Sequence, residues 1–268
     1  MRRVAIAVGL ALVAGACSNV TGTPPDTSLG EWELVFNDEF NGASLDSTHW
    51  HPCYWWDDDG CTIITSNELE WYQRDQVTVS DGLLTLRAEP GFVEATNGND
   101  YEFVSGMVST GRSTFELDQP PRFAFEYGFV EARVSVPEGA GIWPAIWMLP
   151  ATNESTPEID ILEVYADPGV AKMRLHWEDS DGDQRAGHET SIDDLHTGFH
   201  TFGLEWTPDE LRWFIDGREV WRVDENVPQE PMYLLLNLAV GGDAPGPPDS
   251  STSFPADFVV DWVRIWQR

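Results

Sequence analysis

Short runs in which apolar and polar residues alternate recur along the chain after residue 30. Side chains on a strand point to opposite faces in turn, so this alternation is typical of strands with one buried face. No long segment repeats its apolar residues at the 3.6-residue period of a helix. The pattern predicts strands at Gln76–Val79, Leu83–Arg87, Phe123–Val136, Met173–His176, Thr201–Trp206, Leu211–Ile215, Glu219–Val223, Tyr233–Leu238 and Phe258–Ile265.

Turn residues separate these runs. Asp81-Gly82 and Pro137-Glu138-Gly139 follow apolar segments, and Asp216-Gly217 between two runs predicts a hairpin with a type I′ turn. Eighteen prolines and twenty-three glycines disfavour long helices. Many short strands without intervening helices predict an all-β sandwich or barrel.

The run Glu158–Glu163, with the sequence EIDILE, does not fit a regular strand. Strict alternation would place Glu163 in the core with the isoleucines and expose Leu162. One extra residue near Ile161–Leu162 removes this conflict, because all three acids then face one way and the aliphatic residues the other. We therefore predict a β-bulge there, a feature that often re-aims a side chain beside an active site.

Three acids on one face suit glycoside hydrolysis. Glu158 and Glu163 would lie about four strand steps apart, roughly 13 Å between Cα atoms. Their side chains could lean over Asp160 and bring the carboxyl groups to the roughly 5–5.5 Å of a retaining mechanism. Three such acids cannot all ionise readily, so at least one pKa should rise. A polar strand edge in an acidic protein is the alternative reading.

The run also resembles the active-site signature of glycoside hydrolase family sixteen, in its bulged, laminarinase-like form. Similar blocks occur in family order between about Trp32 and Trp266: Asn67–Tyr72, Gly128–Arg133, Gly141–Leu149, Leu204–Asp209 and Leu236–Gly242. The resemblance implies a two-sheet antiparallel jelly roll with a concave substrate cleft. It implies that Glu158 is the nucleophile, Glu163 the acid/base, and Asp160 the assistant that tunes Glu158.

Further site residues follow from this resemblance. Trp143 and Trp147 are four apart on a strand-like run, so they share a face, and in the family these positions line sugar subsites. His176 matches a histidine near the acid/base, where it would contact Glu163 or substrate. Asn67, Glu68 and Arg133 match positions near the cleft. The alternative for the tryptophans and His176 is packing inside the sandwich.

The resemblance also implies a structural metal site, and one connection differs in length from the family pattern. Asp261 matches a position that often binds a structural calcium ion, with backbone carbonyls near Glu39 and Gly82 as companions. The chemistry itself requires no cofactor. The stretch Arg112–Arg122 looks longer than the usual connection and is expected to reshape one end of the cleft.

The first thirty residues have the features of export. Arg2 and Arg3 precede an apolar run and the small residues 14–16, which predicts a signal peptide over residues 1–16. Cys17 follows as in a bacterial lipobox, so we expect lipidation of Cys17 and a lipoprotein on the outer face of the membrane; plain secretion is the alternative. Residues 17–30 are a linker, and residues 31–268 one catalytic domain.

Cysteine usage agrees with export. If Cys17 carries lipid, Cys53 and Cys61 remain, and an oxidising compartment favours a disulfide between them. The bridge would hold a loop rich in tryptophan, with Tyr54, Trp55 and Trp56 as a candidate cleft wall. A cysteine-based metal site is not expected, because no further cysteine exists.

Charge limits the partners. The chain has a formal net charge of −31, and removal of Arg2 and Arg3 with the leader would leave −33. Such a surface repels nucleic acid and anionic membranes, which leaves a lipid anchor as the expected membrane attachment, and disfavours sulfated polysaccharides. A neutral glycan is the compatible partner.

Together these features predict a monomeric, retaining endo-β-glucanase that cleaves β-1,3-glucan or mixed-linkage β-1,3-1,4-glucan. Three alternatives share the fold: a transglycosylase, a hydrolase of a neutral galactan such as agarose, and a non-catalytic β-glucan-binding protein. The two glutamates weigh against the last, because binders of this type usually lack them.

Overall fold

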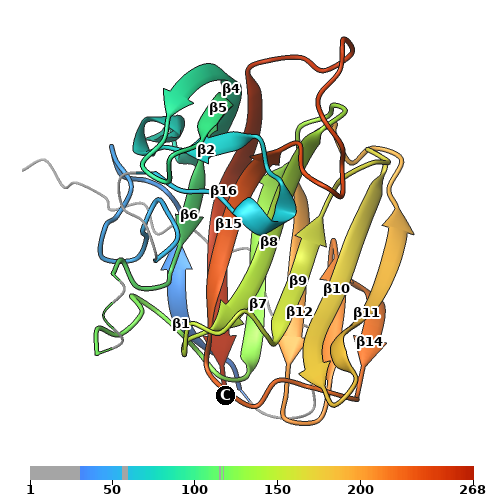
Figure 1. Cartoon of the computed structure of the whole chain (residues 1–268). Helices are drawn as coiled ribbons and strands as arrows, with labels where there is room; N and C mark the ends of the chain where they lie inside the picture. Colours follow the sequence, from blue (N-terminus) through green and yellow to red (C-terminus); the bar gives the residue numbers. More distant parts are fainter. Residues whose placement is uncertain (1–30, 56–59, 115, 117) are drawn as a thin grey trace, which may run out of the picture.

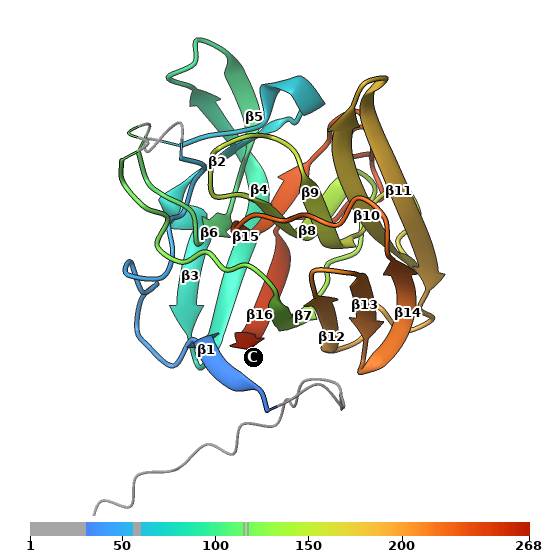
Figure 2. The same cartoon turned by 90° about the horizontal axis from the view of Figure 1, so that it is seen from below.

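A computed structural model describes residues 31–55, 60–114, 116 and 118–268. The predicted signal peptide, Cys17, the linker and Trp56 lie outside the described residues. The described chain forms two β-sheets that pack face to face (Figures 1 and 2). This confirms the all-β, two-sheet sandwich.

The strands and two short 3₁₀ helices follow one another along the chain with turns between them. In order they are β1 (Glu33–Asp38), η1 (Ile64–Ser66), β2 (Glu70–Tyr72), η2 (Arg74–Gln76), β3 (Val77–Ser80), β4 (Leu83–Glu94), β5 (Asp100–Ser105), β6 (Met107–Ser109), β7 (Gly128–Ser135), β8 (Ile142–Pro150), β9 (Glu158–Glu163), β10 (Val170–Asp179), β11 (Gly182–Ser191), β12 (His200–Trp206), β13 (Leu211–Ile215), β14 (Arg218–Val223), β15 (Met232–Val240) and β16 (Ala256–Gln267).

The sheets differ in size. The larger has ten strands in the order β14-β13-β12-β7-β16-β4-β5-β2, with β1 on β16 and β3 on β4. The smaller has the order β11-β10-β9-β8-β15-β6. Pairing is antiparallel except between β2 and β5. The candidate catalytic strand β9 therefore lies inside the smaller sheet, between β8 and β10.

The main core lies between the sheets and follows the alternation of each strand. On β15, Leu234 and Leu236 belong to this core, whereas Tyr233 and Leu235 belong to a second apolar cluster on the outer face. All nine residues of β15 are buried, because loops cover that outer face as well. The outer cluster forms a solid floor beneath the loops.

Several boundaries differ from the predicted ones. The strand expected over Phe123–Val136 begins only at Gly128, because Tyr127 and Gly128 have positive φ angles of 60° and 144°. Strand β11 was not predicted, because its sequence GDQRAGHETS holds few apolar residues. Its full pairing with β10 creates it instead.

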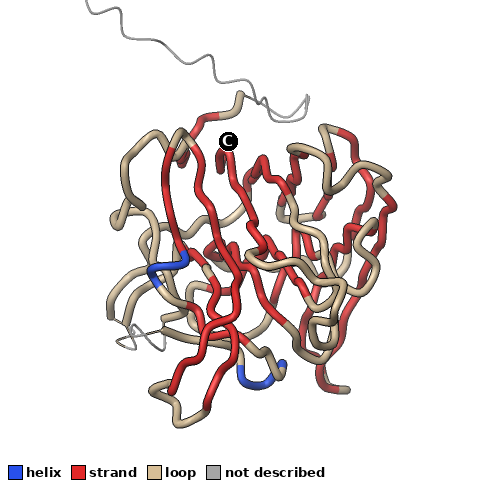
Figure 3. Tube along the Cα trace, turned by 90° about the horizontal axis from the view of Figure 1, so that it is seen from above, coloured by secondary structure: helices blue, strands red, loops and turns tan. Residues whose placement is uncertain are grey.

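The predicted hairpin is present between β13 and β14. Asp216 and Gly217 both have positive φ angles, 49° and 70°, as a type I′ turn requires. Among the residues that the structure describes, the helices are the short η1 and η2 (Figure 3). Within the described ranges, no helix has the length and apolar character needed to cross a membrane.

Candidate active site

Strand β9 contains the predicted bulge. On β8, Ile146 lies opposite Leu162 and the next residue, Trp147, lies opposite Asp160, which leaves Ile161 as the extra residue. The register with β10 shifts at the same place. The bulge therefore sits where the alternation of the sequence demanded one.

The bulge sorts the side chains as expected. Ile159, Ile161 and Leu162 are all buried in the core between the sheets. Their acidic neighbours, Glu158, Asp160 and Glu163, instead line one cleft of about 600 Å³ on the outer face of the smaller sheet. Three carboxyl groups thus converge on a cavity large enough for part of a glycan chain.

A buried tryptophan of the opposite sheet supports the bulge. The indole N–H of Trp213, on β13, donates a 2.9 Å hydrogen bond to the backbone carbonyl of Asp160. Trp213 is fully buried. A bulge interrupts the ladder and leaves backbone groups without strand partners. The Trp213 bond satisfies one of them, a role that its sequence gave no signal for beyond core packing.

Basic residues on β10 face the three acids across the strand pair. Lys172 lies opposite Glu163, Arg174 opposite Asp160, and His176 opposite Glu158. His176 was expected to contact Glu163 or substrate; of the three acids it lies nearest Asp160 and Glu158, with its Nε2 3.3 Å from Asp160 Oδ2 and 3.7 Å from Glu158 Oε1. His176 therefore lies beside Glu158, because the antiparallel register pairs Glu163 with Lys172, four residues before His176.

The two long basic side chains are engaged elsewhere. Lys172 and Arg174 both form ion pairs with Glu189 on β11, at 3.2 and 2.9 Å. Sequence reasoning missed both residues, although the spacing Lys172, Arg174, His176 places them on one face of a strand. Their charges lie near the cleft acids without being in hydrogen-bond contact with them.

Burial dominates the electrostatics of the three acids. It raises the pKa of Asp160 to about 7 and the pKa of Glu163 to about 8, although the charge of Arg174 opposes the shift. Burial, followed by the nearby negative charge of Asp160, raises the pKa of Glu158 as well, and His176 acts in the opposite direction. Near neutral pH the cluster therefore retains protons, as predicted.

Both predicted subsite tryptophans line the cleft. Trp143 donates its indole N–H to Glu163 Oε1 at 3.0 Å, which orients that carboxyl group. Trp147 donates to Asn237 Oδ1 at 2.7 Å and is largely buried. Asn237 in turn donates to the Tyr72 hydroxyl, so a chain of hydrogen bonds runs beneath the cleft from Trp147 to Tyr72.

The segment around the disulfide forms one wall. Cys53 and Cys61 are bonded, as predicted, and both are buried. Tyr54 and Trp55 between them line the cleft. The bridge and the backbone pairing of Cys61 with Tyr72 on β2 together fix this wall. Residues 62–66, which include η1, and the loop residues 153–155 contribute further lining.

Glu68 lines the cleft, as expected, but Asn67 does not. The amide of Asn67 donates to Asp243 at 3.0 Å and holds its loop in place. Burial raises the pKa of Glu68 to about 7. Beside it lies the fully buried Glu70, which accepts from the Val240 amide at 2.7 Å and was not predicted as part of the site.

The prediction that Arg133 lies near the cleft is wrong. Arg133 is on β7 in the larger sheet, where Ala132 and Val134 point into the core and Arg133 points away from it. It forms an ion pair with Asp261 and lies over the Phe199 ring, 4.6 Å from its centre. The whole sandwich separates it from the cleft acids.

The same ion pair bears on the predicted calcium site. The backbones of Glu39, Gly82 and Asp261 approach one another, because Asp38 pairs with Val263 and Leu84 pairs with Val260. The Asp261 carboxylate already forms an ion pair with Arg133, and the Glu39 carboxylate accepts two 2.8 Å hydrogen bonds from Arg264. One carboxylate oxygen and backbone carbonyls remain, a set compatible with calcium.

The stretch Arg112–Arg122 was expected to reshape one end of the cleft. None of its described residues lines the cleft, and Ser113 and Arg122 border a different cavity instead.

Among the side chains that the structure describes, Glu158, Asp160 and His176 form the single acid–histidine group close enough to share a cation.

Comparisons with known proteins agree with this geometry. The sequence profile described as Glycosyl hydrolases family 16 matches residues 66–264. Endo-1,3-1,4-beta-glycanase EglC of Rhizobium meliloti is 34% identical over 87% of this chain and 51% of its own length. A beta-glucanase of Rhodothermus marinus is 31% identical over 100% of this chain and 95% of its own length.

A solved structure adds a bound sugar to the comparison. LamA of Z. galactanivorans, in complex with laminaritriose and laminaritetraose, is 32% identical and superposes with a TM-score of 0.74. The alignment covers 87% of this chain and 98% of that one. This chain spans about half the length of the first curated relatives that it matches.

Proposed function

Because the chain belongs to glycosyl hydrolases family 16, we propose that it is a retaining, endo-acting glycoside hydrolase of β-1,3-glucan or mixed-linkage β-1,3-1,4-glucan. The observation that carries this proposal is the bulge in β9, which turns Glu158, Asp160 and Glu163 into one cleft. The names of the relatives, a 1,3-1,4-glycanase and a beta-glucanase, support the substrate class.

In the first step, the Glu158 carboxylate attacks the anomeric carbon while Glu163 donates its proton to the leaving oxygen. Glu163 is suited to the acid role, because burial raises its pKa to about 8 and keeps it protonated near neutral pH. Trp143 holds the carboxyl group through Oε1, at 3.0 Å. The other oxygen is left for the glycosidic oxygen.

Glu158 must be ionised at that moment. Asp160 and His176 lie beside it and favour this state, because a protonated Asp160 can donate to Glu158 and a charged His176 stabilises its anion. In the second step, Glu163 deprotonates a water that attacks the anomeric carbon and releases the sugar from Glu158. The flat faces of Trp143 and Trp147 give the sugar rings an apolar surface.

The test is reducing-end release from linear β-1,3-glucan, compared with mixed-linkage glucan and agarose. We expect rapid release of short oligosaccharides from the β-glucans, and Glu158→Ala should abolish it while the melting curve stays cooperative. Products longer than the substrate would indicate a transglycosylase. Retained turnover in Glu158→Ala would refute the nucleophile assignment, and binding without release would indicate a glucan-binding protein.

Three further properties belong to the proposal. We propose export with a lipid on Cys17 and a monomeric state, which mass spectrometry of the mature N-terminus and light scattering would check. Calcium at Asp261 would stabilise the larger sheet without taking part in the reaction. A chelator should then lower the melting temperature, and added calcium should restore it; an unchanged melting temperature would count against the site.

A further inference from the structure

A second cavity lies apart from the catalytic cleft. It measures about 310 Å³, which is at the lower end of the range of small-molecule sites. Its lining comes from residues 44–52, from η2 and β3, and from Ser113 and Arg122. No residue lines both this cavity and the cleft. It is built where the backbone of His51 pairs with Ser109 on the edge strand β6.

Two arginines converge on this cavity without an acidic partner. Arg74 and Arg122 both line it, and neither forms an ion pair with any acid that the structure describes. Arg122 donates instead to the carbonyls of Ser47 and Gly111, at 2.9 and 3.3 Å. Burial, followed by the charge of Arg74, lowers the pKa of Arg122. In a chain with 46 acidic and 15 basic residues, two neighbouring arginines without an acidic partner are unusual.

A buried histidine completes the group. His51 lines the same cavity with only 2% of its surface exposed, and its Nε2 has no hydrogen-bond partner. Buried polar atoms are nearly always paired, so this nitrogen calls for a partner that a ligand would supply. Burial and the charges of Arg122 and Arg74 lower the pKa of His51 to about 4, so the ring is neutral and can donate from Nε2.

We propose that this cavity binds a dianionic oxyanion group, a phosphate or a sulfate, through Arg74, Arg122 and His51. Two guanidinium charges match the charge of such a group, and arginine binds its oxygens in a fork. A bound anion would relieve the repulsion between the arginines and give His51 its missing acceptor. The space beyond the anion leaves room for a sugar that carries it.

The negative charge of the whole protein does not prevent this binding. At physiological ionic strength, charges separated by more than about 8 Å are largely screened, so the nearest groups decide the local energy. Arg122 and Arg74 are the charges that act on His51, and the acid Asp75 follows Arg74 in η2. The overall charge would slow the approach of an anion and make binding dependent on salt.

The experiment titrates the whole chain with phosphate, sulfate, glucose 6-phosphate and glucuronate at constant ionic strength. Melting temperature and the NMR signal of the His51 ring are the two readouts. Arg74→Ala is the variant of choice, because the side chain of Arg74 makes no described hydrogen bond or ion pair, and its backbone carbonyl keeps the bond from the Val77 amide. Arg87→Ala is the matched control, since Arg87 is an exposed arginine that pairs with Asp257 in the larger sheet.

We expect phosphate and sulfate to raise the melting temperature and shift the His51 signal, with binding at least about tenfold weaker in Arg74→Ala. Tighter binding of glucose 6-phosphate than of phosphate would identify a sugar-borne group, and equal binding the free anion. The proposal is overturned if no dianion shifts His51, if glucuronate alone does, or if Arg74→Ala responds like Arg87→Ala. Hydrolysis of β-1,3-glucan by Arg74→Ala should be unchanged, so the proposal stands or falls independently of the catalytic one.

Discussion

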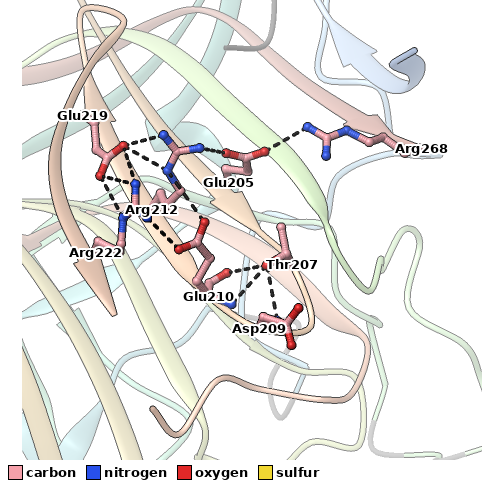
Figure 4. Close-up of polar contacts among 8 residues, drawn as sticks. All are labelled: Glu205, Thr207, Asp209, Glu210, Arg212, Glu219, Arg222 and Arg268. Atoms are coloured by element: carbon pink, nitrogen blue, oxygen red, sulfur yellow. Dashed lines mark hydrogen bonds and ion pairs between the residues drawn. The ribbon is translucent and has the colours of Figure 1, made fainter. Parts of the chain in front are cut away.

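The acids of the cleft and the acids on the outer face of the larger sheet differ in whether arginine side chains bind them directly. On β12–β14, Glu205, Glu210 and Glu219 bind Arg212, Arg222 and Arg268 in one continuous network (Figure 4). Burial of Glu219 would raise its pKa, but hydrogen bonds from Arg222 and Arg212 outweigh it and lower the pKa. In the cleft, burial wins and the pKa of Glu163 rises to about 8.

The difference lies in where the basic side chains go. Each cleft acid also has a basic residue opposite, but Lys172 and Arg174 are drawn to Glu189 on the next strand. Glu189 thus keeps the arginine and lysine at a distance that moderates the charge of the cleft without neutralising it. A carboxylate locked by arginine is structural, whereas one that keeps its proton can transfer it.

Loss of the proton donor should have the largest effect. Glu163→Gln removes the acid but preserves the shape and the Trp143 contact, so the rate on β-glucan should fall by about 10²–10⁴-fold. The loss should be much smaller with an aryl glycoside whose leaving group needs no proton. Measuring kcat of Glu163→Gln on β-glucan and on the aryl glycoside tests this difference. An equal loss of kcat on both substrates would contradict the acid role of Glu163.

The network on the larger sheet should behave in the opposite way. Glu205 is buried between Arg212 and Arg268, at 2.6 and 2.9 Å, so Glu205→Gln leaves two arginines with a weaker partner. We expect a loss of about 2 kcal/mol in the free energy of unfolding, or about 4–8 °C in Tm, with unchanged kcat. Glu225→Gln, at an exposed acid, is the control. A drop in kcat without a drop in Tm would contradict the comparison.

The smallest effect should come from releasing Lys172 and Arg174. Glu189→Gln removes their shared partner, so their charges become available to the ionised forms of Glu163 and Asp160. An approaching positive charge lowers a carboxyl pKa, and Glu163 must be protonated to act. Activity of the unchanged protein should fall as the pH rises through about 8.

In Glu189→Gln this fall should move to lower pH, by less than about one unit. Rate–pH profiles measure the shift. Glu178→Gln removes an equal charge from an exposed position on β10 and is the matched control. If both variants shift the profile equally, the effect comes from net charge alone and Glu189 has no special role.

Much of the site follows from the sequence, because side-chain alternation is local. The conflict between Glu163 and Leu162 in a regular strand demanded a bulge, and the bulge brings Glu163 onto the face that Glu158 and Asp160 already share. The turn at Asp216-Gly217 and the bridge between Cys53 and Cys61 also rest on nearby residues. Each of these features depends on geometry within a few residues.

Tertiary structure decided what lies beside each acid. The pattern of a strand states which face a side chain takes, but strand pairing over long distances sets its neighbours. The register of β10 put His176 beside Glu158, the assignment of β7 to the larger sheet took Arg133 away from the cleft, and Trp213 reached the bulge from the opposite sheet. The sequence by itself determined the acids of β9 and the face they share, whereas strand register and packing decided which side chains lie beside them, and burial raised their pKa values.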